Sequence, residues 1–129
     1  MVKAVGAPGR GGFTLVELLV VMAVVALLLS MVTPRYFASV DRAREAVLKE
    51  TLATVREAID KFHADTGAYP ASLDELVRRR YLRRAPLDPV TESAATWVVV
   101  PARGGAGGLF DVRSGAPGSA ADGTAFSDL

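Results

Sequence analysis

Residues 12–32 read GFTLVELLVVMAVVALLLSMV, and this stretch says more about the chain than any other. From Leu15 to Val32 almost every side chain is apolar. The 21 residues from Phe13 to Thr33 would form about 32 Å of helix at 1.5 Å per residue, enough to cross a hydrocarbon core about 30 Å thick. We therefore predict a transmembrane helix over residues 13–34.

Two residues interrupt this apolar pattern. Glu17 places a carboxylate near the start of the predicted span, which costs on the order of 3 kcal/mol in hydrocarbon and marks a functional residue that needs a compensating cation. Pro34 follows the span, lacks a backbone N–H and clashes with the preceding turn. It either kinks a continuous helix or marks the boundary of one.

Composition indicates a small anchored protein. The chain has 129 residues, half of them hydrophobic, with room for one modest domain beside a span. Its formal net charge of +1 gives no overall attraction to nucleic acid, so no nucleic-acid partner is expected. It contains no cysteine, so no disulfide can stabilise the fold.

The residues after Pro34 keep a helical pattern but become amphipathic. Apolar residues recur at spacings of four, three, four and three and form one stripe, namely Leu48, Leu52, Val55, Ile59 and Phe62. Charged residues occupy the other faces, and Gly67 is a plausible helix terminator. We predict that residues 35–66 continue the transmembrane helix as an amphipathic half.

Residues 67–129 are predicted to form a small head. Ser72 and Glu75 resemble a capping box at the start of a short helix. Residues 96–100 and 109–113 read as strands joined by a glycine-rich turn, and the chain after Ser114 reads as loop. The expected fold class is α+β, with the long helix packed against a small antiparallel sheet, a short helix and a C-terminal loop.

Other polar features give no enzyme site. His63 is the only histidine and has no serine or cysteine partners near it in sequence, so we interpret it as a helix-surface residue. Five arginines lie within residues 78–84. They could form an anionic-lipid or nucleic-acid patch, but a solvated helix end or a contact for acidic neighbours is the simpler interpretation.

The residues Gly12, Phe13 and Glu17, followed by the apolar run, resemble the processing motif of the type IV pilin and type II secretion pseudopilin superfamily. The resemblance implies that a prepilin peptidase removes a basic leader, residues 1–12, and N-methylates the new Phe13 amine. It also implies that Glu17 faces the Phe13 amine of a neighbouring subunit in a filament. In this family a proline placed like Pro34 lies where the helix often loosens, so Pro34 is a further candidate for assembly.

The predicted head resembles the major pseudopilins of type II secretion in its Asp65-Thr66-Gly67-Ala68-Tyr69-Pro70 turn and its Pro86-Leu87-Asp88-Pro89 segment. That resemblance implies a single-pass protein of the bacterial inner membrane with its head in the periplasm. It would polymerise with itself and with minor pseudopilins into a filament that drives protein secretion. The implied partners are prepilin peptidase, the inner-membrane secretion platform and membrane lipid.

Major pseudopilins commonly bind calcium in the C-terminal loop, so the resemblance also suggests a calcium site. The candidates are Asp122 and Asp128, with a carbonyl from Ser114. Because calcium prefers six to eight oxygen ligands, two scattered carboxylates are a sparse set, and no cofactor at all is the simpler expectation. The 90–93 segment also lacks a glycine that the family has there, which leaves its turn geometry open.

Two alternative functions remain open from the sequence. One is a type IV pilus subunit that acts in adhesion, motility or DNA uptake. The other is a monomeric, membrane-tethered binding module that never polymerises.

Overall fold

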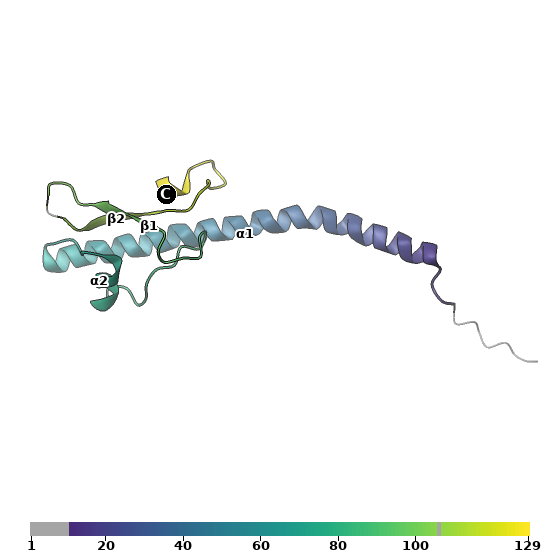
Figure 1. Cartoon of the computed structure of the whole chain (residues 1–129), viewed down its shortest axis with the longest axis horizontal. Coiled ribbons are helices and arrows are strands. Elements are labelled where there is room, and N and C mark those ends of the chain that lie inside the picture. The colour runs from purple at the N-terminus through teal and green to yellow at the C-terminus, as the bar shows by residue number, and fades with distance from the viewer. Residues whose placement is uncertain (1–10, 106) are drawn as a thin grey trace, which may run out of the picture. The chain divides into compact units, whose positions relative to one another are not determined.

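The computed structural model describes residues 11–105 and 107–129. Its elements are α1 (Leu15–Thr66), α2 (Leu73–Arg78), β1 (Trp97–Pro101), β2 (Leu109–Ser114) and a 3-10 helix η1 (Phe126–Asp128) (Figure 1). The chain divides into two compact units, of which the first ends at Ala38 and the second comprises Ser39–Leu129. The predicted α+β fold, with a long N-terminal helix packed on a small antiparallel sheet, is confirmed.

The first unit contains the beginning of α1. Gly12, Phe13 and Thr14 precede the helix, which begins at Leu15 and continues through Pro34. Pro34 is therefore not a helix boundary. The large apolar side chains between Leu15 and Val32 are exposed, as expected for a helix that meets lipid rather than protein.

The second unit is built on the amphipathic half of α1. The predicted stripe is buried: Leu48, Leu52, Val55, Ile59 and Phe62 are each at most 3% exposed. Residues from α2, the segment after it and both strands complete this core, namely Leu76, Leu82, Trp97, Leu109 and Val112. These residues form the layer that buries the stripe, whose exposure to water would otherwise be unfavourable.

The sheet has two antiparallel strands. Trp97 pairs with Ser114 and Val99 with Val112, and the register shifts between Val100 and Pro101. A two-stranded ribbon is marginal alone. Trp97, Leu109 and Val112 contribute buried side chains to the core, so the ribbon is stabilised by packing on α1.

A buried carboxylate organises the 86–93 segment. The side chain of Asp88 is fully buried, and its Oδ1 accepts hydrogen bonds from the backbone N–H of Val90 at 2.8 Å and of Thr91 at 3.4 Å. Its Oδ2 accepts a 2.5 Å hydrogen bond from Ser114 Oγ. Asp88 therefore joins this turn to the end of β2. Glu92 takes the left-handed conformation (φ +56°) within the turn that lacks the expected glycine.

The C-terminal end of α2 also places a non-glycine residue in the left-handed region. Arg80 has φ +64°, its N–H donates to Val77 O at 3.1 Å, and Tyr81 N–H donates to Leu76 O at 2.9 Å. These two bonds form the Schellman motif, in which glycine is favoured at the position of Arg80.

We expect Arg80→Gly to stabilise the protein by about 1 kcal/mol, since an L-residue pays roughly that amount for left-handed backbone. Thermal unfolding of the full chain in detergent measures the change. The control is Arg78→Gly inside α2, which should lose about 1 kcal/mol because glycine is a poor helix former. A melting temperature for Arg80→Gly at or below that of the wild type would contradict this interpretation.

Candidate functional site

The N-terminal motif lies where α1 begins. Thr14 Oγ1 accepts a 3.1 Å hydrogen bond from the backbone N–H of Glu17, and Leu18 N–H donates to Thr14 O at 3.1 Å. Thr14 is therefore the N-cap of α1, and Glu17 is its third helical residue. A carboxylate in the first turn is favoured by the partial positive charge of the helix N-terminus.

Sequence analysis did not single out Thr14. The signal was present, because Thr14 and Glu17 match the S/T-x-x-E pattern of a capping box. The longer Gly12-to-Glu17 motif, which contains both residues, does not by itself indicate this hydrogen bond.

The predicted processing residues lie outside regular structure. Gly12 and Phe13 precede the N-cap, and the Phe13 side chain is 82% exposed. A protease needs an accessible, non-helical backbone, which this segment provides. The leader prediction covers residues 1–12, and of these residues 1–10 lie outside the described part of the chain.

Glu17 forms no ion pair within residues 11–105 and 107–129. It is followed by a stretch of α1 that is long and apolar enough to cross a membrane, none of which is buried. The helix N-terminus supplies only a fraction of a positive charge. The carboxylate therefore still requires a full cation once lipid surrounds it.

Pro34 lies among hydroxyl side chains that bond back to their own helix. Ser30 Oγ donates to Leu27 O and Thr33 Oγ1 donates to Leu29 O, each at 2.7 Å. Pro34 itself has no N–H to donate to the preceding turn. Pro34 thus removes one backbone donor from this segment, although α1 remains continuous.

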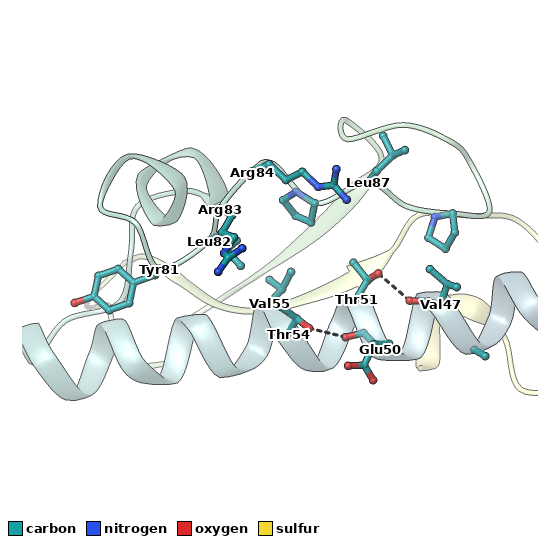
Figure 2. Close-up of a pocket in the computed structure, with 13 residues that line it drawn as sticks. Val47, Glu50, Thr51, Thr54, Val55, Tyr81, Leu82, Arg83, Arg84 and Leu87 are labelled. Atoms are coloured by element: carbon teal, nitrogen blue, oxygen red, sulfur yellow. Dashed lines mark hydrogen bonds between the residues drawn. The ribbon is translucent and has the colours of Figure 1, made fainter.

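The head carries an open groove of about 820 Å³ between the amphipathic half of α1 and the segment after α2 (Figure 2). Its α1 side is formed by residues from Ala46 to Val55, and its other side by residues from Tyr81 to Pro89. Arg83 and Arg84 line it and are exposed, as is Leu87. The groove combines an apolar lining with two cations.

The remaining arginines of the 78–84 cluster belong to the end of α2. Arg79 lies 3.5 Å from Glu75 Oε1, and its guanidinium stacks 5.4 Å from the centre of the Phe62 ring. Arg78 and Arg80 are exposed. Part of the cluster thus has structural contacts, and the described residues bring no row of aromatic rings beside it for base stacking.

The predicted calcium ligands have separate partners. Asp122 Oδ1 accepts a 2.9 Å hydrogen bond from Thr124 N–H, and Asp128 lies 4.0 Å from Arg113. Ser114 is buried, with its hydroxyl bonded to Asp88. In the described residues no group of three or more His, Asp or Glu side chains is arranged to hold a metal ion. This arrangement does not fit the six or more oxygens that calcium prefers.

His63 also takes part in packing. Its ring stacks on Tyr69 with centroids 4.2 Å apart, and Tyr69 meets the edge of Phe110 at 5.5 Å. This half-buried histidine closes the end of the core between α1 and β2. Its recorded ring contact is with Tyr69, and in the described residues it belongs to no group of side chains that could hold a metal ion.

Comparison with known proteins finds one matching family model and several named relatives. Residues 8–33 match a family model described as the prokaryotic N-terminal methylation motif. The chain is 29% identical over 96 residues to the type II secretion system core protein G of Pseudomonas aeruginosa, covering 62% of this chain and 68% of that one. It is 32% identical over 69 residues to the same-named protein of Xanthomonas campestris, covering 54% and 48%.

A third relative aligns over a shorter stretch. The prepilin peptidase-dependent protein A of Clostridium perfringens is 34% identical over 56 residues, which cover 43% of this chain and 40% of that one. No solved structure gives a significant match. This chain thus combines a methylation-motif match at residues 8–33 with similarity to proteins named for type II secretion and for dependence on prepilin peptidase.

Proposed function

We propose that this chain, a pilin-like protein with the prokaryotic N-terminal methylation motif, is a pseudopilin that polymerises through α1 into a periplasmic filament driving type II secretion. Pilins and pseudopilins are structural proteins, so the activity is assembly rather than catalysis. Processing by prepilin peptidase between Gly12 and Phe13, with N-methylation of Phe13, would produce the subunit.

The observation that carries the proposal is the position of Glu17. Its carboxylate lies in the first turn of α1, beside an exposed, non-helical Gly12-Phe13 bond and before a fully exposed apolar stretch. Cleavage after Gly12 would create an amine at Phe13, and a neighbouring subunit would bring its own amine to this carboxylate. An unpaired charge in lipid costs more than a misplaced apolar contact, so this pair would set the register between subunits.

Anchoring follows from the same segment. An N-terminal hydrophobic helix with a pilin motif is consistent with a protein held in the bacterial inner membrane. We place the head in the periplasm and the end before Gly12 in the cytoplasm, where prepilin peptidase acts. Helix-to-helix packing of the exposed apolar side chains supplies cohesion, and loosening near Pro34 gives α1 the adaptability that packing into a filament requires.

Expected partners are further copies of this chain, minor pseudopilins and the inner-membrane secretion platform. The relationship to two proteins named type II secretion system core protein G supports this assignment. The head motifs add to it, because the Asp88 turn and the Tyr69-Pro70 turn that resemble the major pseudopilins both belong to the folded core. A type IV pilus subunit remains the second candidate, since the methylation motif is common to both classes.

Deletion of the gene in its native host distinguishes the two candidates. We expect enzymes that are normally exported to accumulate inside the cell, while surface motility and DNA uptake stay at wild-type levels. Enzyme activity in culture supernatants and colony spreading measure the two outcomes. Re-expression of the wild-type chain should restore export. Lost motility with normal export would reject the pseudopilin assignment in favour of a pilus.

A further inference from the structure

The C-terminal segment is attached directly to the amphipathic half of α1. Glu45 Oε2 accepts a 3.0 Å hydrogen bond from Ala121 N–H, and Arg56 Nη2 donates to Leu129 O at 2.8 Å. Arg56 Nε also donates to Asp111 Oδ1 at 2.7 Å. The segment therefore lies beside α1 (Figure 1), held at two points that are three turns of helix apart.

The loop that contains Ala121 is closed by its own backbone. Ala120 N–H donates to Thr124 O at 2.7 Å, and Gly123 N–H donates to Ala120 O at 3.0 Å. Ser119 and Ala125 form an isolated antiparallel bridge across its base. From here on, the C-terminal loop means residues 118–125, a part of the longer loop expected after Ser114. These backbone contacts hold the loop in shape, and the contacts to α1 attach it to the rest of the head.

At the point where the loop meets α1, an ammonium group pairs with the carboxylate that holds the loop. Lys49 Nζ lies 2.8 Å from Glu45 Oε1, and Glu45 is only 14% exposed although Lys49 is 50% exposed. The Ala121 N–H and then Lys49 hold the pKa of Glu45 below its ordinary value. The pKa of Asp122 is lowered mainly by the Thr124 N–H, and Lys49 contributes to that shift. Lys49 thus has Glu45 and Asp122 as its electrostatic neighbours.

We propose that the Lys49 ammonium is a built-in cation that fastens the C-terminal loop to α1, so that the head becomes ordered without a divalent metal ion. The Glu45 carboxylate accepts the hydrogen bond from Ala121 N–H and forms an ion pair with Lys49. A calcium ion would need six to eight oxygens, whereas Glu45 at this location is already paired with the Lys49 ammonium at 2.8 Å. Asp128, the other candidate ligand, pairs with Arg113 instead.

The test is amide hydrogen exchange on the full chain in detergent micelles, with 5 mM calcium or with EDTA. In the wild type we expect equal exchange rates for the C-terminal loop under both conditions. In Lys49→Gln the loop should exchange roughly two- to fivefold faster, as expected for loss of a partly exposed ion pair. Exchange of the buried Leu52 region should stay unchanged, which shows that the effect is local.

A matched control is Lys61→Gln. Lys61 forms the same type of i,i+4 pair with Glu57, at 3.2 Å, but both side chains are exposed and the pair does not contact the loop. Loop exchange in this control should equal that of the wild type. Slower loop exchange with calcium in the wild type would overturn the proposal, and so would unchanged loop exchange in Lys49→Gln. Neither result depends on whether the chain forms a secretion filament.

A second variant separates the acceptor from the cation. Glu45→Ala removes the oxygen that binds Ala121 N–H and leaves Lys49 in place. We expect the loop to exchange faster than in Lys49→Gln, since the direct hydrogen bond is then lost as well. Equal or slower exchange in Glu45→Ala would show that Lys49 acts on the loop without Glu45 and would overturn the arrangement proposed above.

Discussion

Replacing Glu17 with alanine should leave membrane insertion and cleavage after Gly12 intact but abolish incorporation into filaments. The variant removes a charge that costs on the order of 3 kcal/mol in lipid, so insertion should if anything become easier. It also removes the proposed partner of the neighbouring Phe13 amine, which would then be left unpaired inside the filament. Shearing or pelleting of filaments, followed by immunoblotting, measures the fraction assembled.

Two controls make this result specific. Ser30→Ala changes the other polar residue of the apolar stretch, whose hydroxyl bonds only to Leu27 O, and should assemble normally. Gly12→Ala should block maturation, seen as an uncut band and an unmethylated N-terminus by mass spectrometry. If Glu17→Ala assembled at the wild-type level, the charge pairing between subunits would be the wrong mechanism.

Asp88→Ala should destabilise the head by about 3 kcal/mol. It leaves three buried or half-buried donors without their acceptor, namely the N–H groups of Val90 and Thr91 and the hydroxyl of Ser114. Each unsatisfied group costs about 1–3 kcal/mol, partly recovered by relaxation. Urea unfolding of the full chain in detergent, followed by near-ultraviolet circular dichroism, measures the change.

The matched control is Asp60→Ala, which removes an exposed aspartate from α1 and should change the free energy of unfolding by less than about 0.5 kcal/mol. A similar small effect for Asp88→Ala would mean that the 86–93 turn holds its shape through backbone contacts alone. Asp88→Asn should fall between the two, because its amide oxygen can still accept one or two of the hydrogen bonds.

Periodicity made the main architecture predictable. The stripe from Leu48 to Phe62 depends only on the geometry of one helix and the need to bury its apolar face, so spacing alone identified the core side of α1. The short helix after Ser72 and the two strands followed from equally local signals. The capping box predicted at Ser72 and Glu75 differs in one detail. The Glu75 carboxylate accepts a hydrogen bond from Ala71 N–H, whereas a standard capping box would have it accept from Ser72 N–H.

Polar residues in long-range contacts could not be predicted in the same way. In the sequence, Arg56 is one more charged residue on the polar face of an amphipathic helix. In the structure it donates hydrogen bonds to residues 55 to 73 positions away. Ser114 was expected to offer a carbonyl to a metal, whereas its hydroxyl turns inward to Asp88. These roles depend on which segments the fold brings together, and no local pattern records that.

The attachment of the C-terminal segment to α1 has a consequence for the order of biogenesis. Glu45 and Ala121 are 76 positions apart, and Arg56 and Leu129 are 73 apart, so neither contact exists until nearly the whole chain has emerged from the ribosome. The apolar stretch emerges much earlier and can enter the bilayer while the rest is still being synthesised. With the head in the periplasm, as proposed above, the head would be translocated as an open chain and would fold after export, so the export channel would not have to pass a folded domain.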